Sequence, residues 1–310
     1  MVVCKGTGSG VTVTGLTPGK TYYFALYPYN GGAISTSKPN YYTVEVTDNK
    51  NYAKTLTAEP TVAPTSLTFT QVTTSSIKMN WTNGNGEKRI VVAYLGSAPT
   101  ATPVDSVTYT ANSAYGDPNT VIPGGTGYVV YNGNSNTVTV TNLLPNSRYY
   151  FVVYEYNGSG IYTNYYTTGA SGNRYTLATE PTVQAHNISF APQTPSLANN
   201  TQLILSWVRG NGDGCIVLAK AGAPIAAAEN PVDQANTDDY TANAAFGAGD
   251  RIGDAYVVHS GTANTVTVTG LLYGETYYFK VYEYNNGNGT NTAYATSTIN
   301  YLTSDATGNP

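Results

Sequence analysis

Histidine, cysteine and acidic side chains could do chemistry here only if their spacing brought several of them into one site. The 310 residues contain two histidines, His186 and His259, and two cysteines, Cys4 and Cys215. These are too few and too scattered for a zinc site, a disulfide framework or a Ser-His-Asp triad. The sequence therefore predicts no catalytic residue, no metal and no cofactor.

Two glutamates, Glu155 and Glu283, occupy equivalent places in two repeats, where a third repeat has Pro28. A glycosidase needs two carboxyl groups in one site, whereas these belong to different repeats. We interpret them as charges at strand ends. The glycine-rich stretches 6–10 and 210–214 are interpreted as hairpin turns, because no helix follows to bind a phosphate and the acidic ligands of a calcium loop are missing.

Tyrosines are the strongest candidates for binding. Within the repeats they recur on one strand face, and if that face is exposed its rings could stack on sugars. The alternative, which we favour, is that a repeated insertion folds over this face, with Tyr109 and Tyr115 packing against it. The candidate residues are Tyr150, Tyr154, Tyr156, Tyr278, Tyr282 and Tyr284, with Tyr23, Tyr27 and Tyr29 at the corresponding positions of the first copy.

The elements that carry these residues occur three times, at 11–30, 138–157 and 266–285. Each copy begins with valine and threonine in strict alternation, which predicts a half-buried strand. A Leu-x-x-x-x-x-Tyr spacing follows and fits a tyrosine corner, in which the phenol hydrogen-bonds back to the backbone. The corner tyrosines are Tyr22, Tyr149 and Tyr277.

The repeat register also divides the chain. Residues 1–4 align with 128–131 and 256–259, so position 1 falls in the middle of a module and Cys4 occupies an ordinary strand position. We expect residues 1–57 to form the second half of a module and residues 58–179 and 180–310 to form complete ones. Either the sequence is a piece of a longer chain, which we favour, or another chain supplies the missing strands.

Two tryptophans, Trp81 and Trp207, are each followed by a Gly-Asn-Gly turn and an Ile-Val-x-Ala strand. With the tyrosine corner, these features resemble the fibronectin type III domain, where they have structural roles. The insertions, which share Pro-Val-Asp at 103–105 and 231–233, resemble enlarged modules of secreted and cell-surface multidomain proteins of gliding Gram-negative bacteria. The resemblance implies an all-β fold of tandem fibronectin type III-like (immunoglobulin-like) β-sandwiches with an inserted flap.

Composition narrows the function. Charged residues make up 10% of the chain, against about 25% in typical soluble domains, which suits an extracellular or cell-surface protein. With 14 Lys and Arg and a net charge of −4, no basic surface for nucleic acid is expected. No apolar run approaches the roughly 18 residues of a membrane span, so we expect no direct membrane insertion.

We therefore expect a non-catalytic structural or adhesive repeat region of a large secreted or surface-anchored bacterial protein. Its partners would be other domains of the same long chain, with surface glycans or neighbouring protein chains as further candidates. The alternatives are carbohydrate-binding modules that use the tyrosine face, and a fibre subunit completed by a neighbour's strands.

Overall fold

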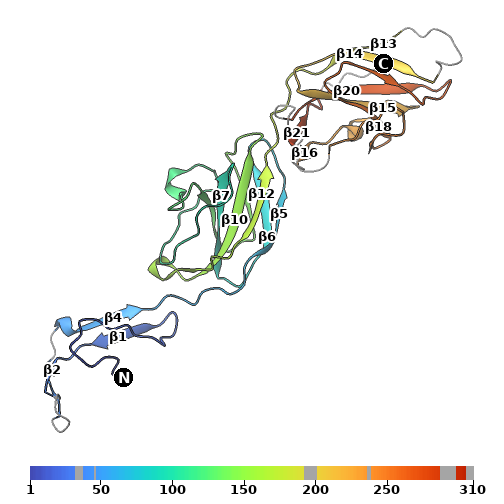
Figure 1. The fold of residues 1–310 in the computed structure, drawn as a ribbon. Coiled ribbons are helices and arrows are strands. Elements are labelled where there is room, and N and C mark those ends of the chain that lie inside the picture. Colours follow the sequence, from blue (N-terminus) through green and yellow to red (C-terminus); the bar gives the residue numbers. More distant parts are fainter. Residues whose placement is uncertain (32–37, 45–46, 192–200, 236–238, 287–297, 305–310) are drawn as a thin grey trace.

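Nearly all the regular structure is β-strand, arranged in three units that follow one another end to end (Figure 1). The computed structural model describes residues 1–31, 38–44, 47–191, 201–235, 239–286 and 298–304. The first unit contains β1 to β4, the second module β5 to β12 and the third module β13 to β21. The helices among the described residues are single 3-10 turns, and none of them could cross a membrane.

The second module is a sandwich of two antiparallel sheets. One sheet has the order β5-β6-β9, from Thr65–Thr70, Ile77–Thr82 and Thr137–Val140. The other has the order β11-β10-β7-β8, with β12 also on β10, from Asn164–Tyr165, Arg148–Asn157, Lys88–Leu95, Tyr128–Gly133 and Ala170–Tyr175. A short turn, η3 (Gly160–Tyr162), connects β10 to β11.

The third module repeats this arrangement. Its smaller sheet is β13-β14-β19, from His186–Phe190, Leu203–Val208 and Thr265–Val268. Its larger sheet is β16-β21-β20-β15-β18-β17, from Gln234–Ala235, Thr298–Tyr301, Tyr277–Asn285, Gly214–Ala221, Ala255–Gly261 and Arg251–Ile252.

Each sandwich is held by a core between its two sheets. In β6 the side chains of Ile77, Met79 and Trp81 are buried while those between them are more exposed. This alternation follows from the two-residue period of a strand. These side chains pack against Val91 of β7 and Phe151 of β10, from the opposite sheet. The equivalent core of the third module contains Trp207 and Phe279.

A second core lies on the outer face of each larger sheet, beneath the inserted segment. In the second module, Tyr109 and Ile122 of the insertion pack on Tyr154, Tyr156 and Tyr165. The insertion includes η2 (Pro118–Thr120) in the second module and η4 (Ala227–Glu229) in the third. The predicted flap is therefore confirmed as a structured cover.

The expected role of Tyr115 in this outer core is wrong. Its ring packs edge-on against Tyr128 and Tyr149, at centroid distances of 4.8 and 5.1 Å, and belongs to the core between the sheets. An isolated bridge between Ala114 and Thr141 places this part of the insertion beside the smaller sheet. Tyr115 therefore covers an open end of the inner core.

The first unit pairs β1 (Thr21–Ala25) with β4 (Lys50–Lys54), and β2 (Tyr29–Asn30) with β3 (Asn40–Tyr41). The turn η1 (Thr47–Asn49) precedes β4. The predicted strands over 1–4 and 11–14 are wrong, because these residues adopt no strand. The equivalent β9 and β19 pair with β6 and β14, and the described part of residues 1–57 contains no such partner.

Candidate functional site

In the two complete modules the tyrosine face is buried, which corrects the hypothesis of an open, sugar-stacking surface there, whereas Tyr23 and Tyr27 of the first unit are exposed. Tyr150 and Tyr278 are half-buried. The other four candidates keep at most 7% of their surface exposed, because the flap covers them. These are Tyr154, Tyr156, Tyr282 and Tyr284.

Two hydroxyl groups of this face form hydrogen bonds within the protein. Tyr282 donates a hydrogen bond to Asn230 Oδ1 (2.8 Å), and Tyr156 donates one to Asn132 Oδ1. Desolvation raises the pKa of Tyr154 to about 12 and raises that of Tyr282 further. These phenols are therefore neutral core groups at physiological pH.

The repeated Pro-Val-Asp segments attach the flap to β11 in the second module and to β21 in the third. Asp105 Oδ1 accepts a hydrogen bond from the backbone N–H of Tyr165 (2.8 Å), and Asp233 Oδ1 accepts one from Tyr301 (2.9 Å). Desolvation raises the pKa of Asp233, opposed by this hydrogen bond. The repeat of the motif was visible in the sequence, but its role as an anchor was not.

A shallow pocket of about 360 Å³ opens between the flap and β10, and its lining includes Lys88, Tyr109, Asn132 and Tyr156. No carboxylate, imidazole or thiol lines it. The described residues also contain no cluster of three or more His, Cys, Asp or Glu that could hold a metal.

The corner tyrosines and the tryptophans have structural contacts. The phenol oxygens of Tyr22, Tyr149 and Tyr277 each accept a hydrogen bond from a backbone N–H five residues earlier, at 2.7, 2.9 and 2.9 Å. Trp81 and Trp207 keep 3% exposure each. The corner thus recurs in all three units, including the first, whose sheets are the smallest.

Glu155 is more than a charge at a strand end, because it is fully buried and binds the turn between β6 and β7. Its carboxylate accepts hydrogen bonds from the backbone N–H groups of Gly84 (2.8 Å) and Gly86 (3.1 Å). It also accepts from Nε (3.3 Å) and Nη2 (3.0 Å) of Arg89. The same guanidinium donates to the carbonyl oxygens of Gly86 (3.1 Å) and Asn134 (2.7 Å).

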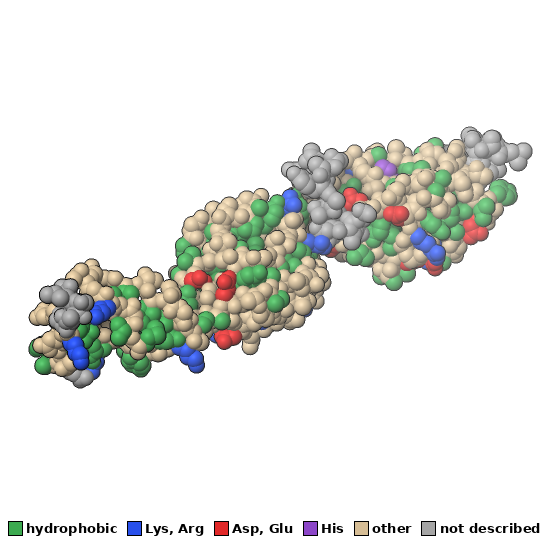
Figure 2. Space-filling model, turned by 60° about the horizontal axis from the view of Figure 1, so that its bottom comes forward, with side chains coloured by type: hydrophobic (Ala, Val, Ile, Leu, Met, Phe, Trp, Pro, Cys, Tyr) green, Lys and Arg blue, Asp and Glu red, His purple; other side chains and the backbone are tan. Residues whose placement is uncertain are grey.

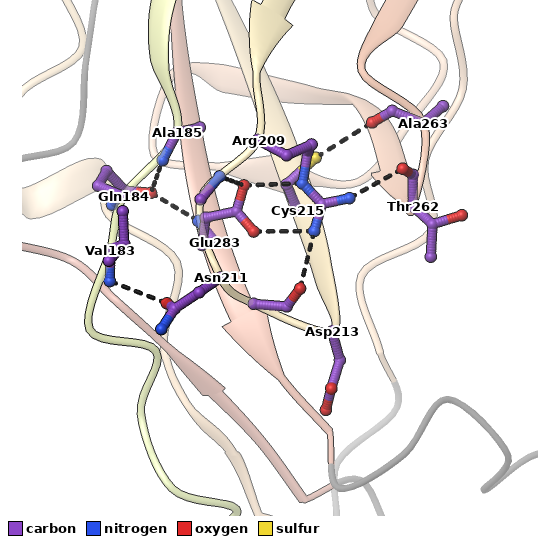
Figure 3. A network of polar contacts seen from close by, with 12 residues as sticks. Val183, Gln184, Ala185, Arg209, Asn211, Asp213, Cys215, Thr262, Ala263 and Glu283 are labelled. Carbon is purple, nitrogen blue, oxygen red and sulfur yellow. Dashed lines mark hydrogen bonds and ion pairs between the residues drawn. The ribbon is translucent and has the colours of Figure 1, made fainter.

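Glu283 forms the same arrangement in the third module (Figure 3). Its carboxylate accepts from the backbone N–H of Gly210 (2.9 Å) and from Nε (2.7 Å) and Nη2 (2.8 Å) of Arg209. The guanidinium donates to the carbonyls of Gly212 (3.1 Å) and Thr262 (2.9 Å). The hydrogen bonds to Glu283 raise the pKa of Arg209, so its guanidinium stays charged.

The two arginines reach this common position from different places in the chain. Arg209 lies two residues after Trp207, where the second module has Asn83 after Trp81. Arg89 lies where the third module has the buried Cys215. Sequence reasoning missed the pair because the arginine changes position between repeats, although the repeated glutamate was a visible signal.

The turn held by this ion pair also holds the linker that precedes each module. Asn85 Oδ1 accepts from the backbone N–H groups of Thr61 and Val62 (2.9 Å each). Asn211 Oδ1 accepts in the same way from the backbone of 182–183. Gly84 must be glycine, because a Cβ there would overlap the carbonyl of Val62.

In each complete module, two further asparagines hold the linker just before its Glu-Pro sequence. In the second module, Asn164 Nδ2 donates to Thr57 O (2.9 Å) and Asn157 Nδ2 donates to Ala58 O (2.8 Å). Thr57 donates its backbone N–H (3.3 Å) and its hydroxyl (2.6 Å) to Tyr162 O. We call this arrangement the linker clasp.

The third module has the same linker clasp. Asn300 Nδ2 donates to Ala178 O (2.9 Å) and Asn285 Nδ2 donates to Thr179 O (2.8 Å). The backbone N–H of Ala178 donates to Thr298 O (2.9 Å). Each complete module therefore grips the segment that connects it to the preceding unit.

The sheet orders, tyrosine corners and flaps define a class of fold: tandem fibronectin type III-like, or immunoglobulin-like, β-sandwiches with an inserted flap. Residues 62–167 match the family described as the Fibronectin type III domain. No curated protein matches the chain.

Solved structures similar to this chain include three with fibronectin domains. A two-domain segment of chicken tenascin is 11% identical, covering 77% of this chain and 96% of its own, with a TM-score of 0.27. The FN1–FN3 domains of chicken CNTN1 are 14% identical over 87% and 74%, with a TM-score of 0.34. A fibronectin domain of human collagen XX is 23% identical over 37% and 100%, with a TM-score of 0.21.

Proposed function

We propose that this chain is a non-catalytic spacer region of a secreted or surface-anchored bacterial protein, and that its modules form a semi-rigid stalk. The observation that carries this proposal is the repeated grip on the linkers. Asn85 and the linker clasp of Asn157 and Asn164 hold both sides of the Glu-Pro sequence, and the third module repeats these contacts.

Physical chemistry supports a linker that resists bending. Pro60 and Pro181 are buried and fix φ at the junctions, and the residue before each proline is restricted to extended conformations. A linker with these restraints transmits orientation between modules, whereas a glycine-serine linker would not. The resemblance to modules of gliding bacteria and the sparse surface charge (Figure 2) support placement outside the cell.

The distance distribution between modules tests this proposal. Spin labels at the exposed Ser97 and Glu275, in a chain with both cysteines replaced, report the relation of the second to the third module. We expect one narrow distribution, which broadens when Asn285 and Asn300 are changed to alanine.

Alanine at Asn30 and Asn40 provides the matched control, since that pair lies in the first unit and should leave the distribution unchanged. A distribution that is already broad in the unmodified chain would show that the linker contacts do not restrain the modules.

A fibre subunit is the second candidate, favoured by the surface of the first unit. Tyr23, Leu26 and Tyr52 are 81%, 77% and 64% exposed. In the second module the equivalent strand β10 pairs with β7, whereas the described partner of β1 is β4. A neighbour's strand could cover this edge by β-addition. Light scattering that shows a monomer at every protein concentration would rule the fibre out.

A further inference from the structure

The first unit contains a third copy of the asparagine pair that forms the linker clasp in the other two modules. Asn30 pairs with Asn40 across β2 and β3, as Asn157 pairs with Asn164 and Asn285 with Asn300. In every copy the next residue pair inward is two tyrosines, with ring centroids 5.4, 5.0 and 5.5 Å apart.

The backbone around the pair is also shared. Tyr42 N–H donates to Pro28 O at 2.9 Å, and the equivalent bonds to Glu155 O and Glu283 O have the same length. This agreement holds even though Pro28 replaces the buried glutamate.

The polar groups that grip a linker elsewhere are open here. Asn30, Asn40 and Lys38 are exposed. Lys38 lies two residues before Asn40, as Tyr162 and Thr298 lie two residues before Asn164 and Asn300. In this alignment its carbonyl corresponds to Tyr162 O and Thr298 O, each of which accepts from a linker N–H.

Gly31 indicates which linker sequence fits. Its equivalent in the second module is Gly158, where a Cβ would overlap the hydroxyl of Thr57. The third module has Asn286 at this position and accommodates the smaller Ala178. A glycine at this position therefore goes with a threonine as the first linker residue held by the clasp.

We propose that Asn30, Gly31, Lys38 and Asn40 form a binding site for an extended peptide of sequence Leu-Thr-Ala-Glu-Pro. The two asparagine amides donate to the carbonyls of its threonine and alanine. The carbonyl of Lys38 accepts from the threonine N–H and hydroxyl. The proline restricts the glutamate before it to an extended conformation.

The site does not depend on the stalk proposal, because it follows from the clasp geometry alone. A chain whose second and third modules proved flexible could still bind the peptide. Conversely, a rigid pair of modules with no peptide binding would overturn only this inference.

The test is a titration of the isotope-labelled 310-residue chain with a capped peptide of residues 55–61, followed by NMR. A few surface hydrogen bonds correspond to a dissociation constant of about 1 mM. We expect the side-chain amide signals of Asn30 and Asn40 to shift along one binding curve. The equivalent amides of the second and third modules should stay unchanged, since their own linkers occupy them.

Two variants make the result specific. Asn30→Asp with Asn40→Asp keeps the side-chain shape and removes the amide donors, so the peptide should no longer shift the backbone amide signals of Gly31 and Lys38, which it should shift in the unmodified chain. A peptide with the Ala-Thr order of residues 176–182 lacks the threonine hydroxyl at the first position and should bind about threefold to tenfold more weakly. No shift up to about 5 mM peptide, which lies above the expected dissociation constant, would overturn the proposal. The proposal would also be overturned if these amide signals shifted with protein concentration in the absence of peptide, because a second copy of the chain would then occupy the site.

Discussion

The sharpest test of the ion pair is to move the arginine of the third module from position 209 to position 215, which is the equivalent of Arg89 in the second module. Arg209→Asn, which copies Asn83, leaves Glu283 fully buried without its charged partner. Breaking a buried pair from one side costs about 3–5 kcal/mol. The side chain of Arg209 is 19% exposed, so water can partly replace it and we expect the lower end, about 3 kcal/mol.

The second substitution should restore most of this loss. Cys215→Arg, added to Arg209→Asn, places a guanidinium where Arg89 has one, and this group can donate to the equivalent backbone carbonyls. Cys215→Arg alone should be strongly destabilising, because two guanidinium groups would then compete for one carboxylate. We expect the double variant to lie within about 1 kcal/mol of the unmodified module, a strong coupling between two neighbouring sites.

Urea unfolding followed by tryptophan fluorescence measures these differences. The chain has two tryptophans, one in each complete module, so Trp81→Phe leaves Trp207 as the reporter of the third module. At a slope of about 2 kcal/mol/M, the single variant should shift the midpoint by about 1.5 M.

The reciprocal exchange, Asn83→Arg with Arg89→Cys, is the matched control in the second module. A double variant that unfolds no later than Arg209→Asn alone would refute the equivalence of the two arginines.

The remaining predictions concern pH, thiol reactivity and the flap core. Desolvation, with a smaller effect of Arg209, holds the pKa of His259 below its usual 6.5, so the folded state favours the neutral ring. The contribution of the neutral ring to folding stability is complete above pH 6.5 and is lost as the pH falls from there through the folded pKa. Urea unfolding midpoints measured at a series of pH values should show this loss. The variant His259→Tyr, which copies Tyr131, should remove this pH dependence. In a thiol assay only the exposed Cys4 should react before unfolding, because Cys215 is buried and desolvation raises its pKa to about 12. Tyr282→Ala should destabilise the third module by about 3–5 kcal/mol, whereas an unchanged melting temperature would contradict the buried assignment of the tyrosine face.

The corner and strand patterns were predictable because they depend on neighbouring residues. The alternation in β6 and β10 and the tyrosine spacing are local properties of the chain. They led to the all-β fold, and the repeated insertion led to the flap; the structure confirms both. The strand expected over 11–14 failed because a strand also needs a partner, which no local pattern can supply.

The sequence by itself therefore determined the class of fold, the repeat and the set of residues that form its cores. The tertiary structure decided which face each tyrosine meets and what each charged side chain binds. Arg209 and Glu283 are 74 positions apart, and Arg89 and Glu155 are 66 apart. Such contacts arise only when strands distant in sequence pack together. A free energy that depends on burial cannot be inferred from a residue's neighbours in the chain.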